Sequence, residues 1–67
     1  MNELYIIQSK GDTPRTYLHQ IGSTGDPEFT LNVRQAMRYV NRAEPELFLD
    51  KKSLAKSYEV VTAPPKL

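Results

Sequence analysis

Few side chains in this sequence could carry out covalent or metal chemistry. There is no cysteine and only one histidine, His19, so disulfide bonds, cysteine metal sites and histidine-pair metal sites are excluded. A Ser–His–Asp arrangement would have to use His19. The serines that could act with it are Ser9, Ser23, Ser53 and Ser57, and no nucleophile motif surrounds any of them. We therefore expect a protein that is not an enzyme and needs no cofactor.

Two polar stretches contain residue types that occur in ligand sites. The backbone N–H groups of residues 22–25 (GSTG) could cradle an anion, but no Gly-Lys-Ser/Thr follows, so this is not a P-loop. Asp26 and Glu28 could contact a cation, but their spacing matches no calcium-binding loop. We interpret the first stretch as a flexible connection and the acids as surface carboxylates, and we expect no metal site.

The clearest chemical pattern is a row of arginines. Arg34, Arg38 and Arg42 recur every four residues, a spacing that places them on one face of a helix, with Tyr39 beside them. Arginine forms paired hydrogen bonds with carboxylates and phosphates. The row therefore predicts contact with an acidic or phosphate-bearing partner. The alternative is a solvated helix face on which Arg42 pairs with Glu46, four residues on.

A second basic group follows the arginines and could extend them into one basic patch. It consists of Lys51, Lys52 and Lys56. The residues that we expect to contact a partner are Arg34, Arg38, Tyr39, Arg42, Lys51 and Lys52.

Length and composition limit what can position these groups. The chain has 67 residues, which suits one small domain, expected over residues 1–63 with a tail at 64–67. It is 39% hydrophobic and 25% charged, which is typical of a folded protein. Its formal net charge of +1 argues against general coating of DNA. No apolar run approaches the ~18 residues that a membrane span needs, so we expect a cytoplasmic protein without membrane contact.

Strand-forming stretches alternate with turns. Apolar, β-favouring residues predict strands at Leu4–Gln8 and within 15–21, joined as an antiparallel hairpin by a turn at 10–14. A turn-rich loop at 22–27 precedes a short strand at Phe29-Thr30. A last strand at 58–62 is expected to pair with the first.

The helical patterns lie between these strands. Apolar residues at 33, 36, 37 and 40 predict a helix over 33–42, which Asn32 and Gln35 would cap. A second helix is expected over 45–55, with Glu44 as its cap and Pro45 at its first position. The alternative is a short extended stretch at 47–49 followed by one helical turn at 51–56. The predicted fold is α+β: a small antiparallel sheet, made of the hairpin and the C-terminal strand, with one or two helices packed on one face.

The first strand presents apolar residues on both faces. Leu4 and Ile6 alternate with Tyr5 and Ile7, so either terminal residues or a partner must cover the second face. A homodimer could use it. Tyr5 and Tyr17 could also form a cross-strand pair, and such a pair could stack on single-stranded nucleic acid. The alternative is that the tyrosines complete a small core.

Short stretches spread over most of the chain carry a resemblance. They are YIIQ at 5–8, TYL at 16–18, Phe29-Thr30, Ala36, Tyr39 and YEVV at 58–61. In this arrangement the chain resembles small phage or prophage accessory proteins of ββαβ type. The resemblance implies a protein of the host-cell cytoplasm that binds and blocks a host or immune component, including CRISPR effectors, or that modifies host transcription. It implies no catalytic residue.

These observations lead to one expectation about function. We expect a phage-derived inhibitor that occludes a host protein or nucleoprotein complex. The alternatives are a small nucleic-acid-binding protein and a homodimeric structural module.

Overall fold

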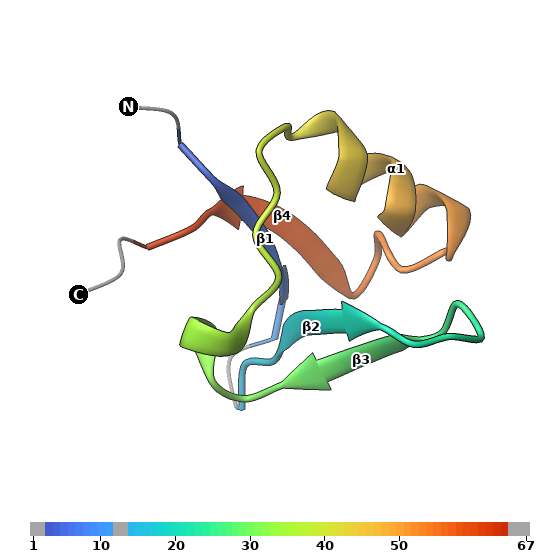
Figure 1. Cartoon of the computed structure of the whole chain (residues 1–67), viewed down its shortest axis with the longest axis horizontal. Coiled ribbons are helices and arrows are strands. Elements are labelled where there is room, and N and C mark those ends of the chain that lie inside the picture. Colours follow the sequence, from blue (N-terminus) through green and yellow to red (C-terminus); the bar gives the residue numbers. More distant parts are fainter. Residues whose placement is uncertain (1–2, 12–13, 65–67) are drawn as a thin grey trace.

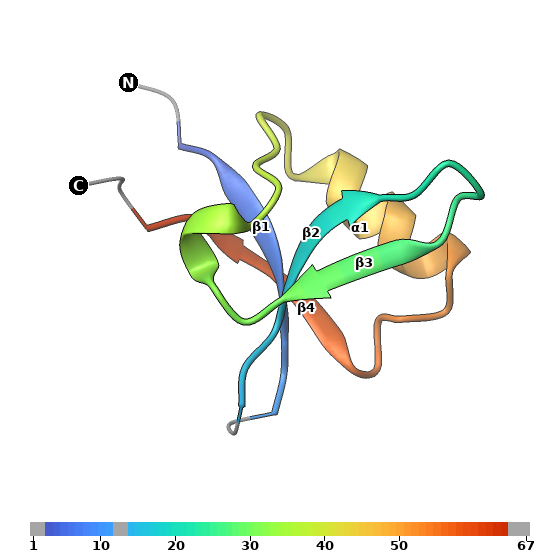
Figure 2. The same cartoon turned by 60° about the horizontal axis from the view of Figure 1, so that its bottom comes forward.

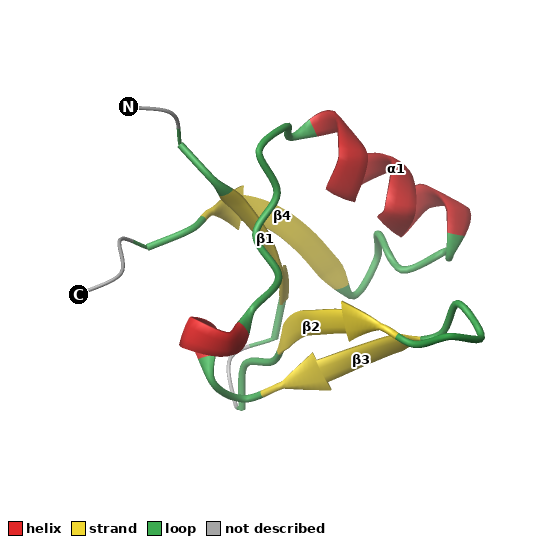
Figure 3. Cartoon of the chain, in the orientation of Figure 1, coloured by secondary structure: helices red, strands yellow, loops and turns green. Residues whose placement is uncertain are grey.

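The computed structural model describes residues 3–11 and 14–64, and this part of the chain forms one four-stranded sheet with a helix beside it (Figures 1 and 3). The strands are β1 (Tyr5–Ser9), β2 (Tyr17–Ile21), β3 (Pro27–Thr30) and β4 (Tyr58–Thr62). The helices are the short 3-10 helix η1 (Val33–Gln35) and α1 (Ala43–Lys51). The strands are antiparallel in the order β3-β2-β1-β4. The predicted α+β class, the hairpin and the pairing of the last strand with the first are confirmed.

The core lies on one face of the sheet. The register pairs Ile7 with Val60 and Gln8 with Tyr17, so Ile7, Val60 and the neighbouring Leu18 share a face. Leu49 of α1 packs against these side chains, and the four form the buried cluster of the protein. α1 covers this face with Leu49 and the partly buried Phe48, while its charged residues remain exposed.

Both faces of β1 are buried within the chain. Ile7 is 0% exposed on the core face, and Ile6, which points to the opposite face, is only 1% exposed. The apolar second face expected for β1 is therefore not open to a partner. A homodimer built on that face is not supported.

The sheet splits between β1 and β2, and another segment enters the gap. The two strands are paired at Gln8 and Tyr17, but beyond this point β1 pairs at Tyr5 with Tyr39 instead. Tyr5 and Tyr39 exchange two backbone hydrogen bonds of 2.8 and 2.7 Å. The N–H of Met37 donates to the C=O of Leu18 at 2.8 Å. Residues 37–39 thus join the diverging strands.

The helix predicted over 33–42 is wrong. Only Val33–Gln35 is helical, and Ala36 already has an extended conformation. The predicted cap is present, because Asn32 Oδ1 accepts a hydrogen bond from Arg34 N–H at 3.0 Å. Val40, which the helical pattern placed on the buried face, is 70% exposed. Backbone pairing with β1 and β2 replaces the helix after its first turn.

The second helix exists, but its limits differ from those predicted. It begins at Ala43, where Asn41 Oδ1 accepts the Ala43 N–H at 2.8 Å, so Glu44 is not its cap and Pro45 is its third residue. It ends at Lys51 rather than at residue 55. The alternative with an extended stretch at 47–49 is also wrong, because those residues are helical.

A left-handed residue ends α1. Ser53 has φ 57°, and the N–H groups of Ser53 and Leu54 donate to the C=O groups of Asp50 and Leu49 at 3.2 and 2.9 Å. This is the Schellman arrangement, in which glycine usually occupies the left-handed position. Leu54 and Leu49 also share the core cluster, as the hydrophobic contact of that motif requires. The helix therefore stops here although its sequence contains no glycine.

Two predictions lie partly beyond the described residues. The turn expected at 10–14 includes residues 12–13, and the tail expected at 64–67 includes residues 65–67; neither part is described. Pro64 is described, and its C=O accepts a hydrogen bond from Arg38 Nη1 at 3.0 Å.

Candidate functional site

The arginine row does not form a continuous ridge. Because residues 36–42 are not helical, Arg34, Arg38 and Arg42 do not share a helix face. Arg34 is exposed in η1. Arg38 is half-buried, and its Nη1 holds the C=O of Pro64 at 3.0 Å. Its Nε is buried without a hydrogen-bond partner among the described residues. Arg38 thus holds the C-terminal segment against the rest of the chain.

Arg42 contacts three parts of its own chain. Its Nε pairs with Glu46 Oε2 at 2.7 Å, the i,i+4 pair that the sequence offered as the alternative to partner binding. Its Nη2 donates to the C=O of Val60 at 3.4 Å, and its guanidinium lies 5.9 Å from the centre of the Tyr5 ring. This side chain connects the start of α1 to β1 and β4.

Tyr39 is also used within the fold. Its backbone pairs with Tyr5, and its side chain packs against the core cluster. Burial raises the pKa of the Tyr39 phenol above its ordinary value of 10.0, and the negative charge of Glu44 raises it further. The phenol is therefore neutral at physiological pH.

The tyrosine platform predicted for nucleic acid is absent. Tyr17 lies opposite Gln8 and Thr30, whereas Tyr5 lies opposite Thr62. Because Tyr5 shares the face of Ile7 and Tyr17 shares the face of Gln8, the two tyrosines point to opposite sides of the sheet. They cannot stack on neighbouring bases.

The lysines form the basic group that remains exposed. Lys51 and Lys52 lie at the C-terminal end of α1, and Lys56 lies in the loop that follows. Positive charge is favoured there because the last carbonyl groups of a helix carry partial negative charge. The side chain of Lys52 reaches the β2–β3 turn, since a Cβ added to Gly25 would lie 3.8 Å from its Nζ.

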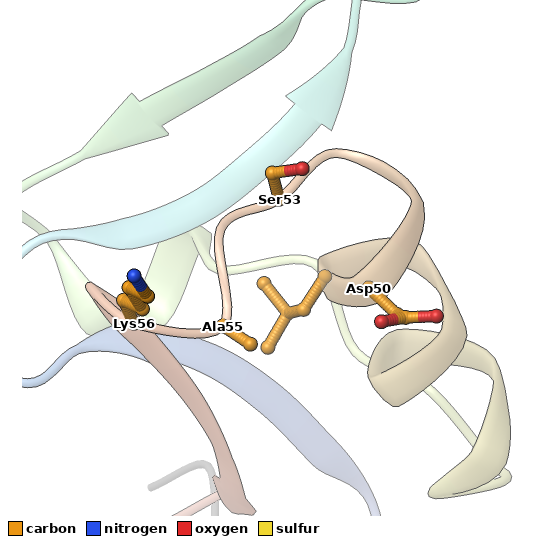
Figure 4. Close-up of a pocket in the computed structure, with 5 residues that line it drawn as sticks. Asp50, Ser53, Ala55 and Lys56 are labelled. Carbon is orange, nitrogen blue, oxygen red and sulfur yellow. The ribbon is translucent and has the colours of Figure 1, made fainter.

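A pocket opens next to these lysines. Its volume is about 390 Å³, within the range of small-ligand and side-chain pockets, and its lining residues are Leu49, Asp50, Ser53, Ala55 and Lys56. Figure 4 shows Asp50 and Lys56 on opposite sides of the pocket, with Ala55 between them. Leu49 and Ala55 provide an apolar lining, while the acid, the hydroxyl and the ammonium group surround it. The pocket can hold an apolar side chain flanked by polar groups.

Sequence reasoning found the lysines but not the pocket. Asp50, Ser53 and Ala55 come together because the left-handed Ser53 turns the chain back over the end of α1. The only local signal is the pair Leu49 and Leu54, whose five-residue spacing suits the contact of a Schellman motif.

The groups considered for catalysis are not assembled. His19 is exposed, and its Nδ1 lies 2.7 Å from the C=O of Gln35. Within residues 3–11 and 14–64, no serine is hydrogen-bonded to His19, and no three His, Cys, Asp or Glu side chains cluster closely enough to hold a metal ion. Asp26 and Glu28 bond instead to Thr24 and Gln20.

Two further findings concern membrane spans and similarity to known proteins. Over the described residues there is no helix with the length and apolarity that crossing a membrane requires. Comparisons with protein-family models, curated proteins and solved structures give no match.

Proposed function

We propose that this protein is a phage-derived, non-enzymatic inhibitor that binds a host protein or nucleoprotein and occludes its surface, as anti-defence proteins of the anti-CRISPR type do. The observation that carries the proposal is the exposed lysine group beside an apolar-lined pocket at the end of α1. The pocket would receive an apolar side chain of the partner. Lys51, Lys52 and Lys56 would contact acidic or phosphate groups around it.

The size of the molecule supports occlusion as the mechanism. A stable interface buries about 800 Å² on each partner. The Cα trace measures 31 × 26 × 23 Å, so an interface of that area would use most of one face. A domain this small that covers a working surface of a larger protein inhibits it by steric exclusion alone.

The site differs from the one that the arginine row suggested. Arg38 and Arg42 hold the fold together, so replacing them would damage the protein and binding at once. Arg34 is exposed in η1, which lies apart from the C-terminal end of α1 (Figure 1), and the proposed site does not include it. The lysines can be exchanged without loss of a described hydrogen bond or ion pair of their side chains.

The test compares two variants with the same change in charge. Lys51→Glu alters the proposed site, and Arg34→Glu makes the same change in charge at an exposed cation away from it. Immobilised protein is used to retain partners from a bacterial host lysate, and the retained partner is then purified and titrated with each variant by calorimetry. We expect the first variant to weaken binding at least about tenfold, a loss of about 1.4 kcal/mol, and the second to leave affinity nearly unchanged. Equal affinity of both variants would refute the site.

A DNA titration separates the main alternative. Single- and double-stranded DNA are titrated at two salt concentrations. Tight, salt-sensitive binding would show that nucleic acid is the partner and would reject the proposal. The separation of Tyr5 from Tyr17 removes the stacking surface on which that alternative depended.

A further inference from the structure

The two edges of the sheet differ in how they are closed. At the free edge of β4, the N–H of Tyr58 donates to the C=O of Leu54 at 2.9 Å. Two residues later in β4, the C=O of Val60 accepts a hydrogen bond from Nη2 of Arg42. Residues of the chain itself therefore occupy two backbone groups along this edge, and these contacts compete with the addition of a further strand there.

The edge formed by β3 is open. Leu18 directs its C=O toward Met37 and thus away from β3. Its partner Phe29 is therefore in a non-hydrogen-bonded pair and directs its own N–H and C=O away from β2. In Figure 1, no other strand or helix lies below β3. A row of unpaired backbone groups of this kind is a template for another strand.

Apolar side chains gather along the same edge. Among the described residues, the large hydrophobic side chains that are exposed include Ile21 at 41%, Phe29 at 37% and Leu31 at 65%, all on or next to β3. Ile21 lies opposite Pro27, the first residue of β3. The strand contains one charged residue, Glu28, which is bonded to Gln20 Nε2 at 2.7 Å. β3 contains no lysine, while Pro27 removes one backbone donor at the start of the strand.

We propose that two copies of this chain pair through β3, antiparallel about a two-fold axis at Phe29. In this register each Phe29 donates its N–H to the C=O of the other, and each Leu31 N–H faces the C=O of Pro27 in the second copy. Glu28 lies opposite Thr30 of the second copy, so no like charges face each other.

The occupant is a second copy because the edge is self-complementary and the assembly closes. Pro27 has no N–H that could donate. The N–H groups that face outward from β3 and from the residue after it are therefore those of Phe29 and Leu31. The two-fold register gives both of them an acceptor. Since both copies use the same edge, β3, the two-fold pairing consumes it and ends with two copies instead of continuing into a fibre. The inference is independent of the proposed inhibitor role and does not use its lysines.

Sedimentation equilibrium of the full chain tests the proposal with a matched pair of variants. Leu31→Lys places a charge beside the two-fold axis, while Val40→Lys adds the same charge at an exposed apolar residue away from β3; Val40 is 70% exposed. We expect the wild type to dimerise as concentration rises, Leu31→Lys to weaken dimerisation at least about tenfold, and Val40→Lys to leave it unchanged. Circular dichroism checks that both variants fold.

Two sedimentation results would reject the proposal. One is a wild type that stays monomeric up to hundreds of micromolar. The other is a dimer that Leu31→Lys and Val40→Lys affect equally.

Hydrogen exchange gives a second, independent readout on the unmodified protein. The Phe29 amide should exchange more slowly as protein concentration rises, because it becomes bonded only in the dimer. The Met37 amide, already bonded to Leu18, serves as the internal control. Protection of Phe29 that appears only when a different protein is added would identify the occupant as a foreign strand and reject the two-copy proposal.

Discussion

The ring of Phe29 in β3 stacks on the ring of Tyr58 in β4, with centroids 4.7 Å apart and planes inclined by 17°. These two strands are at opposite ends of the sheet order, so the sheet must curl strongly for their side chains to meet across its concave side. Figure 2 shows the β2–β3 pair crossing over the β1–β4 pair. The two halves of the sheet, β1–β4 and β2–β3, are paired directly at Gln8–Tyr17 between β1 and β2. The stack therefore adds another connection between them.

The stack predicts energetic coupling between these distant residues. In a double-mutant cycle of Phe29→Leu and Tyr58→Leu, we expect a coupling of about 0.5–1.5 kcal/mol, the usual value for an aromatic pair. Urea unfolding at low protein concentration measures the four free energies. Additive effects of the two substitutions would show that the rings contribute only their separate burial.

Arg42 should contribute more to stability than the ion pair that it forms. Both side chains of the Arg42–Glu46 pair are 54% exposed, so Glu46→Ala should cost only about 0.3–0.5 kcal/mol. Arg42→Ala also removes the contact with the Tyr5 ring and the bond to Val60, and should cost about 1 kcal/mol more. Chemical denaturation of both variants checks this. Equal losses would mean that the contacts with β1 and β4 contribute nothing.

Tyr39 should make stability depend on alkaline pH. Its pKa is raised in the folded state by burial and by Glu44, so folding favours the neutral phenol. That contribution is fully present below the unfolded-state pKa of about 10 and is lost as pH rises through the folded-state value. Urea unfolding at a series of pH values should show a steeper alkaline loss for the wild type than for Tyr39→Phe. Identical profiles would contradict the prediction, and the shared titration of lysines cancels in the comparison.

Ser53 is a position where a smaller residue should stabilise the protein. Its φ of 57° is unfavourable for a residue with a Cβ but accessible to glycine. We expect Ser53→Gly to raise the free energy of unfolding by about 0.5–1 kcal/mol. This value is the relief of left-handed strain minus the larger conformational entropy that glycine loses on folding. Ser57→Gly is the matched control, because Ser57 does not have a positive φ, and it should be neutral or destabilising. A gain with Ser57→Gly as large as with Ser53→Gly would rule out relief of left-handed strain as the cause.

Local sequence determined the strands of this protein. The β-favouring runs at 4–8, 15–21 and 58–62 predicted β1, β2 and β4 to within one or two residues, because alternating burial and β-branched residues act at short range. The short strand predicted at Phe29-Thr30 is also present, but it begins two residues earlier, at Pro27, which the sequence had assigned to the loop. The order of the predicted strands and helices also predicted the α+β class correctly.

Helix limits and the roles of the arginines were decided by tertiary structure. The pattern at 33–42 suits a helix. Tyr39 instead forms two backbone hydrogen bonds with Tyr5, which lies 34 positions earlier in the chain. Those bonds, and the one from Met37 to Leu18, become possible only once β1 and β2 have diverged. Helix propensity is worth only tenths of a kcal/mol per residue, so such pairing overrides it.

In the candidate site, too, some features could be predicted from the sequence and others depend on tertiary structure. The sequence alone predicted that basic side chains would provide the charged groups of the proposed site, because charge is a property of residue type. Only the folded chain decided that Arg38 and Arg42 would hold the protein together while Lys51, Lys52 and Lys56 stay exposed beside a pocket. The physical reason is that an arginine's partner depends on which distant carbonyl, carboxylate or ring the fold brings within reach, and no local spacing encodes that.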